Sequence, residues 1–567
     1  MLKKPKARVA FISGPSATIQ NTPPLVTSNK ARTKHGLPER RKPDGSLIKF
    51  DALRSQRLAV PAKVYVEQFS AHPLEVDAAE LYGPPDGYID KNGSFSTTRR
   101  NENDRPVFEI ELKPDDGLYP LPYMARQADG TPWEDELAFP GAPDEKARQT
   151  FLPDGSFSFE EIDRLALDSD GTASLISSKA DVDFYRITPA AGFKKGLAQP
   201  LRKDTGDGDI TPEQRGRHFN SYKPYHLASV PSRPALARIT NQIQAVCDSG
   251  KYDGLIWTQG SPQIEETVHW FNLLINTKAP ICGTASQRTQ GQISADGPKN
   301  IVDSISYIQS GVWKDSQGHN RCGTILVQEQ QFFAAREVTK VDARPGGYRA
   351  AGGHGGVLGQ ISYIDKISLM YVPSYKHTYL SETNITKLPE TANAVRRRDD
   401  KLESINITIK DSNGRLTEEA IPSVSIIKDG GYFDELYDTA IDDSKDLIAL
   451  IEHKLSLGRL SGFVTEGLTP YGRLPSSHRE ALLLRATFSG IPIVRVGRGA
   501  PEGFADHSPF AIAGSNLTAI KARLTLMACL MKFGALPIAE NPSSPTKEER
   551  EKTIAVIARY QDIFDSH

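Results

Sequence analysis

The sequence has little cysteine. Its 567 residues include only four, Cys247, Cys282, Cys322 and Cys529, which lie far apart without a CxxC pair. A disulfide framework or a structural zinc site requires several cysteines at short, regular spacings. We therefore expect buried free thiols and no metal bound through cysteine.

Long apolar runs and a net charge of one sign are absent as well. Apolar runs such as 447–451 and 524–531 fall far short of the roughly 18 residues that span a bilayer. The start, MLKKPKARVAFISG, passes from a short strand-like run straight into a turn, unlike a secretory signal. Because 69 Lys and Arg face 70 Asp and Glu, no overall field favours nucleic acid or an anionic membrane. These absences predict a cytoplasmic protein without a nucleic-acid or membrane partner.

The chain is long enough for two to four domains, at about 150 residues each. Residues 7–12, ARVAFI, predict a first strand. From about 21 to 225 Pro, Gly, Asp and Ser are frequent and helical periodicity is scarce. Tyr, Phe and Leu recur throughout this stretch, so we expect a large insertion, partly β and rich in loops, and not a disordered tail.

From about residue 231 short apolar strands alternate with helical patterns. Such alternation indicates a parallel sheet with helices on both faces. The polar stretch 376–419 predicts a connection between domains, and a second α/β series fills 420–567. We expect helices within 235–247, 264–275 and 300–308, and strands within 253–260, 279–284 and 323–330.

Several segments resemble, in order, the bacterial-type asparaginase/glutaminase family. DGLIWTQGSPQIEETVHWFNLL, at 253–274, is similar to its second signature, a strand ending in Thr-His-Gly-Thr-Asp before a Glu-Glu-Thr helix. GTASQRTQGQISADGPKNIVDSI, at 283–305, resembles its Gly-Ala-Met-Arg segment and continuation, and 332–361 resembles the segment that carries its catalytic lysine. Residues 462–499 and 516–530 are similar to its C-terminal domain. The match covers 7–20, 226–375 and about 420–567.

The resemblance implies a two-domain asparaginase-like α/β fold. Its larger N-terminal domain, 1–375, would hold a doubly wound sheet and the insertion, and the smaller C-terminal α/β domain would occupy 420–567. The implied activity is hydrolysis of a carboxamide C–N bond in a small molecule by a hydroxyl nucleophile, with no metal and no cofactor. The family further implies a homodimer or homotetramer.

The resemblance assigns Ser261 and Lys340 to proton transfer. Ser261 matches the family threonine of the second signature, and Lys340 ends REVTK at the position of the family lysine. A neutral hydroxyl is a poor nucleophile, and a desolvated lysine can activate it because burial lowers the lysine pKa. Each residue also has a plain structural interpretation: Ser261 as the cap of the helix that starts near Gln263, and Lys340 as a solvated surface lysine.

The nucleophile has two candidates. The family places its threonine in a Thr-Gly-Gly-Thr-Ile turn after the first strand, where this chain has ISGPSATIQN. A gapless alignment from the strand gives Ser16, whereas an alignment anchored on the following isoleucine gives Thr18. We prefer Thr18 slightly, because Thr-Ile leads into the following loop as in the family. The other hydroxyl would serve the turn's backbone.

The substrate-binding positions depart from the family. We assign substrate binding to Gln259, Gly260, Pro262 and Ser229. Pro262 stands where the family has an aspartate that binds the substrate's α-ammonium, and the family's loop tyrosine has no counterpart. Two further ammonium contacts, from the C-terminal domain, are replaced near Gly472 and near His507 or Ser508. A charged amino group would lack its ion partners, so the substrate is expected to differ from plain L-asparagine.

The loop after the first motif is rich in lysine and arginine. Such charge runs are usually solvated, but closure of this loop over the site would favour an anionic substrate. One alternative is a hydrolase of the same fold that opens a lactam, a cyclic imide or an N-substituted amide. The other is a non-catalytic binding protein. The basic residues are Lys30, Arg32, Lys34, Arg40, Arg41 and Lys42.

Overall fold

The computed structural model describes residues 6–14, 25–28, 44–46, 50–53, 56–57, 62–66, 75–77, 85–90, 95–112, 118–119, 180–186, 206–207, 209–210, 233–261, 263–288, 296–342, 346–350, 356–362, 366–428, 444–468, 472–498 and 508–567. These residues form a mixed α/β structure with parallel strands, as the sequence predicts. Two compact units alternate along the chain. The first comprises 1–231, 252–261 and 284–309, and the second comprises 232–251, 262–283 and 310–567. The boundaries expected near 375 and 420 stay a prediction.

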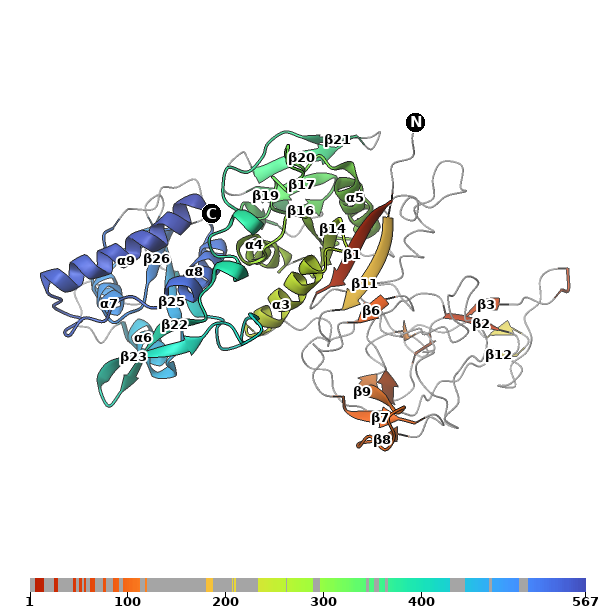
Figure 1. The fold of residues 1–567 in the computed structure, drawn as a ribbon, viewed down its shortest axis with the longest axis horizontal. Helices are drawn as coiled ribbons and strands as arrows, with labels where there is room; N and C mark the ends of the chain where they lie inside the picture. The colour runs from red at the N-terminus through yellow and green to blue at the C-terminus, as the bar shows by residue number, and fades with distance from the viewer. Residues whose placement is uncertain are drawn as a thin grey trace. The chain divides into compact units, whose positions relative to one another are not determined.

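Parallel strands lie side by side in the first unit in the order β14, β1, β11 and β6 (Figure 1). β1 (Ala7–Ser13) pairs with β11 (Ala180–Arg186) along its whole length and with β14 (Gly254–Thr258) from Val9 onward. Val9 through Ile12 are fully buried. The apolar run from Val9 to Ile12 therefore reflects a part of the strand covered on both faces, and the predicted first strand is confirmed.

The stretch 21–225 contributes strands to this arrangement. β11 and β6 (Glu75–Asp77) both come from it, and they pair in parallel with each other. The segment expected to be an insertion thus supplies the strand next to β1. Its other described strands are β2 (Leu25–Ser28) with β3 (Phe50–Leu53), β4 (Gln56–Arg57) with β10 (Leu118–Tyr119), β12 (Gly206–Asp207) with β13 (Asp209–Ile210), and the antiparallel set β5 (Ala62–Val66), β9 (Arg105–Leu112), β7 (Gly87–Ile89) and β8 (Phe95–Ser96).

The second unit begins with the two helices that the sequence predicts before and after β14. Trp270 on α4 donates its indole N–H to Thr240 on α3 at 2.8 Å, and both side chains are buried. The polar Thr240 is therefore satisfied inside the core. The elements of this part are α3 (Ala235–Asp248), α4 (Ile264–Leu274), β15 (Ile281–Thr284), β16 (Thr324–Gln328), β17 (Gln331–Ala334), β18 (Val338–Lys340), β19 (Tyr348–Ala350), β20 (Val357–Ile361) and β21 (Ile367–Leu369); α5 (Gly297–Ser310) falls almost wholly in the first unit.

A second set of parallel strands follows, with helices packed against it. Three helices begin at hydroxyl N-caps: Ser476 for α7, Thr518 for α8, and Thr546 for α9, which forms a capping box with Glu549. Such caps satisfy backbone N–H groups that a helix start leaves unpaired. The elements are β24 (Ser423–Lys428), β25 (Ser461–Gly467), β26 (Ile493–Gly497), β27 (Ile512–Ala513), α6 (Lys445–Leu457), α7 (Ser477–Phe488), α8 (Ala519–Phe533) and α9 (Lys547–Ser566).

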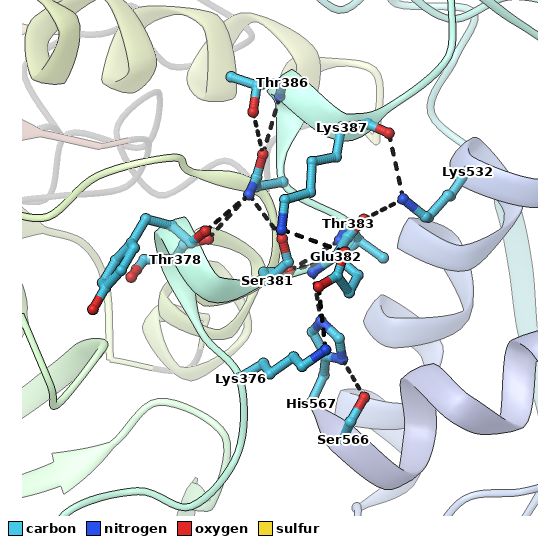
Figure 2. A network of polar contacts seen from close by, with 12 residues as sticks. Lys376, Thr378, Ser381, Glu382, Thr383, Thr386, Lys387, Lys532, Ser566 and His567 are labelled. Atoms are coloured by element: carbon cyan, nitrogen blue, oxygen red, sulfur yellow. Dashed lines mark hydrogen bonds and ion pairs between the residues drawn. The ribbon is translucent and has the colours of Figure 1, made fainter.

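The stretch 376–419, expected as a connection, contains ordered elements. Figure 2 shows its first part held by the last helices: Glu382 donates its N–H to His567 Nε2 at 2.7 Å, and Lys532 Nζ donates to the Glu382 carbonyl at 2.5 Å. The Glu382 carboxylate pairs with Lys376 at 3.1 Å. The stretch includes η5 (Thr378–Leu380), η6 (Ile385–Lys387), β22 (Thr391–Arg398) and β23 (Lys401–Thr408).

The structure bears on the expectations about the cysteines and about membrane-spanning segments. All four cysteines are free thiols, as predicted. Within the described part of the chain, every helix is too short or too polar to cross a lipid bilayer.

Candidate active site

The turns after β1 and β14 begin at the same edge of the sheet. Ser13 and Thr258 are register partners in the parallel pair, and Gly14 donates its N–H to the Thr258 carbonyl at 2.8 Å. Carboxyl ends of neighbouring parallel strands are where open α/β sheets bind their ligands. The structure therefore brings the start of the first motif beside the second motif. Ser16 and Thr18 follow Gly14 by two and four residues but lie outside the described residues.

Close packing fixes these two turns. A Cβ on Gly14 would lie 2.3 Å from the Trp257 ring, so the backbone there approaches the indole more closely than any side chain would allow. Trp257 is fully buried and donates its Nε1–H to Gln259 Oε1 at 2.9 Å. Gln259 is itself 3% exposed. The predicted substrate-binding residue Gln259 thus also holds the indole against the first turn.

Gly260 and Ser261 complete the turn before α4, and both are half-buried. The N-cap of α4 is Gln263, and its side chain makes no capping hydrogen bond. The N-cap position lies two residues after Ser261, so both interpretations of Ser261 stay predictions. The predicted substrate-binding residues Pro262 and Ser229 lie outside the described residues.

A third turn in the first unit is shaped by a buried aspartate that the sequence reasoning did not single out. Asp296, 3% exposed, accepts the N–H groups of Gln287 at 3.0 Å and Arg288 at 2.7 Å. Asn300 donates to the Asp296 carboxylate at 3.1 Å and to the Ala285 carbonyl at 2.8 Å. Both residues belong to the ADGPKN segment that carried the resemblance. An acid two residues before the conformationally restricted Pro298 was the available signal for a loop-shaping role.

Lys340 ends β18 in the second unit, whereas Ser261 belongs to the first. The lysine is half-buried, and its strand pairs with β19, where Tyr348 is its register partner. The backbone N–H of Lys340 donates to the Glu265 carboxylate, and the Thr339 side chain also hydrogen-bonds Glu265. The backbone of Lys340 is thus bonded to a buried acid on α4 to which the sequence analysis assigns no role.

Charge is concentrated in the core beneath Lys340. Burial raises the pKa of Glu265 above its ordinary value, although Lys521 opposes the shift. Burial lowers the pKa of Lys521 to about 8, and this lysine donates to the carbonyls of Glu265 at 2.5 Å and Ala335 at 2.6 Å. His269, fully buried, has a pKa well below its usual range because burial disfavours its charged form. The Lys521 ammonium is thus bonded to backbone carbonyls, and His269 Nε2 lies 3.1 Å from the Thr525 hydroxyl.

Three positions of the C-terminal part were expected near the substrate: Gly472, His507 and Ser508. Gly472 has φ of +70°, and a Cβ there would lie 2.6 Å from the Val496 carbonyl, so backbone geometry alone requires glycine. Ser508 is half-buried, and its hydroxyl accepts the Phe510 N–H at 3.4 Å. His507 lies outside the described residues. Among the residues described, no group of three or more His, Cys, Asp or Glu side chains is arranged to hold a metal ion.

The fold and these turns define an α/β protein with hydroxyl-bearing loops at the carboxyl edge of parallel strands. Residues 216–348 match the model of the asparaginase N-terminal domain.

Individual relatives agree with this family. The chain is 30% identical over 105 residues to the glutaminase-asparaginase of Acinetobacter glutaminasificans (18% of this chain, 30% of the relative) and 33% identical over 108 residues to the L-asparaginase of Bacillus licheniformis (19% and 32%). It is 28% identical over 152 residues to L-asparaginase 2 of Escherichia coli (27% and 41%). The chain thus spans between 30% and 41% of the length of these relatives.

Proposed function

We propose that this protein is an asparaginase-type amidohydrolase that cleaves a small carboxamide to a carboxylate and ammonia. The observation that carries the proposal is the junction of the two turns: Ser13 beside Thr258, with the Gly14 N–H bonded to the Thr258 carbonyl. This junction would set the hydroxyl of the first turn and that of Ser261 at one edge of the sheet. The family match of residues 216–348 supports the same reaction class.

In the proposed mechanism, the hydroxyl of Thr18 or Ser16 attacks the carboxamide carbon. Its proton passes through Ser261 to Lys340, and backbone N–H groups of the turns hold the oxyanion. Collapse of the tetrahedral intermediate breaks the C–N bond, and the departing nitrogen takes the proton and leaves as ammonia. Water then attacks the acyl-enzyme ester, which yields the carboxylate and restores the hydroxyl.

The substrate proposed is a carboxamide other than plain L-asparagine. The names of the relatives point to asparagine or glutamine as their substrates. In this chain Pro262 replaces the carboxylate that would pair with a substrate ammonium, and Gly472 provides no side chain. Burial of an unpaired ammonium is costly. A substrate without a free α-amino group, such as succinamate or a substituted amide, therefore fits better. We further propose a homodimer or homotetramer as the working form.

The test is ammonia release from the purified protein over asparagine, glutamine, succinamate, and N-substituted and cyclic amides. Lys340→Met and Ser261→Ala are each expected to lower the rate by about 100-fold or more, as loss of a proton-transfer group does. The matched control is Lys366→Met, since Lys366 is an exposed lysine of the same unit. Separate Thr18→Ala and Ser16→Ala variants would identify the nucleophile.

Three outcomes decide the proposal. Turnover restricted to amides without an α-amino group supports it in full. Turnover of asparagine that Lys340→Met abolishes keeps the mechanism and overturns the substrate class. If no amide releases ammonia, mass spectrometry of the reaction mixtures separates an amide with an amine leaving group from a binding protein without activity.

A further inference from the structure

Glu265 is a buried carboxylate whose bonds go to the strand that ends in Lys340. The residue is 5% exposed, and its carboxylate accepts the backbone N–H of Lys340 and the Thr339 side chain. A desolvated carboxylate requires hydrogen-bond donors, and here two successive residues of β18 provide them. The end of β18 is thus tied to the first turn of α4, four residues after Ser261 in the chain.

Glu265 is itself fixed from the other side by Lys521. Lys521 on α8 is 1% exposed, and its Nζ donates to the Glu265 carbonyl at 2.5 Å and to the Ala335 carbonyl at 2.6 Å. One ammonium therefore joins α4 to the residue that follows β17. Because ammonium-to-carbonyl bonds in a desolvated core are strong and directional, this contact leaves the α4 backbone at Glu265 little freedom.

Two further contacts join α4 to α8. His269, one turn after Glu265, lies with Nε2 3.1 Å from the Thr525 hydroxyl, one turn after Lys521. Arg523 pairs with Glu266 at 2.5 Å, but both side chains of that pair are partly exposed, at 31% and 28%. Glu265 and Glu266 are therefore adjacent glutamates with different bonding partners. Glu266 pairs with Arg523 on α8, whereas Glu265 reaches Lys340.

We propose that Glu265 is a positioning residue for Lys340, held in register by the buried Lys521. This inference rests on the proposed function, in which Lys340 moves the proton. The Glu265 carboxylate sets the backbone of Lys340, and through it the path of the lysine side chain. Its loss would leave a partly buried N–H without an acceptor and allow the end of β18 to shift. A displacement of about 1 Å at a catalytic group can reduce turnover by about 100-fold.

Four variants test this role. Glu265→Ala removes the acceptor, whereas Glu265→Gln keeps an oxygen that can accept the Lys340 N–H. Glu266→Ala is the matched control, since it removes a neighbouring glutamate of the same helix turn. Should Glu265→Ala fail to fold, Glu265→Asp keeps the buried charge near Lys521 but withdraws the carboxylate from β18 by one methylene. Amide hydrogen exchange of the peptide containing Lys340 and steady-state kinetics are measured for each.

We expect faster exchange at Lys340 and a kcat about 10 to 100 times lower in Glu265→Ala, with KM little changed. Glu265→Gln should recover most of both properties, and Glu266→Ala should change neither. A kcat in Glu265→Ala equal to that of an active wild type would overturn the inference and leave the proposed function intact. Equal effects of Glu265→Ala and Glu266→Ala would also overturn it, since they would indicate loss of helix packing. An inactive wild type would overturn both, and unchanged exchange would contradict the contact itself.

Discussion

Gly14 and Trp257 occupy the space where the turns after β1 and β14 begin. The indole is fully buried, and its N–H is bound by Gln259, so the ring has little room to withdraw. Protein interiors are packed at the density of organic crystals, and an added methyl group against a fixed ring strains both. Glycine is therefore required at position 14 because the Trp257 ring lies against it. Gln259, which binds that ring, precedes Gly260 by one residue and Ser261 by two.

Gly14→Ala is expected to lower the free energy of unfolding by about 1–3 kcal/mol, because its Cβ would lie 2.3 Å from the Trp257 ring. Urea denaturation would measure this loss. Gly297→Ala is the control: its Cβ would lie 3.3 Å from the small Ser286 side chain, at the start of α5, and alanine favours helix. Equal losses in both variants would contradict the explanation based on Trp257.

The hairpin of β22 and β23 has two aspartates at positions of its turn where glycine or asparagine is favoured. The strands pair from Thr391 with Thr408 to Arg398 with Lys401, so only Asp399 and Asp400 connect them. Both aspartates have positive φ, 49° and 60°, as a two-residue type I′ turn requires. Asparagine followed by glycine is the favoured pair in such turns, since left-handed backbone strains residues with a Cβ.

Asp400→Gly is expected to stabilise the protein by about 0.5–1 kcal/mol, because glycine adopts positive φ without a Cβ clash. The comparison variant Asp399→Ala should be destabilising, since alanine lacks the side-chain oxygen that lets aspartate tolerate this conformation. Thermal unfolding of the two variants beside the wild type would measure the difference. A lower melting temperature for Asp400→Gly would contradict the role of the turn.

The elements best predicted from the sequence are those with strong local patterns. The strands β14, β15 and β16 and the helices α3, α4 and α5 follow from short apolar runs that alternate with helical spacing. β11 was missed: its sequence ADVDFYR mixes charged and apolar residues, and its partner β1 lies about 170 residues away. β22 and β23 were missed because RRRDDK reads as a polar connection, although alternate side chains such as Ala394 are buried.

Only part of the candidate site could be predicted from the sequence. The turn after β14 and the lysine at the end of β18 could be found from residue order. The contact of Glu265 with the Lys340 N–H could not, because a hydrogen bond from a backbone N–H to a carboxylate 75 residues away leaves no pattern in the sequence. Asp296 was visible in its segment, but its role depends on four donors that only the folded loop brings together.

Buried histidines give the molecule a predictable response to acid. Burial lowers the pKa of His377 and of His567 to about 4, and it lowers the pKa of His269 well below its ordinary value of 6.5. His567 Nε2 accepts the Glu382 N–H, so it must be unprotonated in the folded state, and Lys376 and Lys387 nearby also disfavour its charge (Figure 2). Between pH 6.5 and about 4 the unfolded chain therefore binds more protons at these sites than the folded chain.

The free energy of unfolding should consequently fall as the pH is lowered from 6.5 to about 4, by up to about 3 kcal/mol for each of His377 and His567. The raised pKa of Glu265 opposes this loss, since the folded state then binds the extra proton. Urea denaturation at several pH values would give the slope, and His567→Gln should reduce it. His453→Gln, at an exposed position, is the control and should leave the slope unchanged. A slope that His567→Gln does not alter would contradict the assignment.

The pairing of β1 has a consequence for synthesis on the ribosome. β1 is made early, yet its partners β11 and β14 begin only at residues 180 and 254. At about 5–20 residues per second, translation needs roughly ten to thirty seconds to reach the first partner. During that interval the apolar segment 9–12 lacks both of its partner strands, and unpaired strand edges are templates for association between chains. Production of this protein in cells should therefore depend on chaperones that bind the segment around β1, whatever reaction the finished molecule performs.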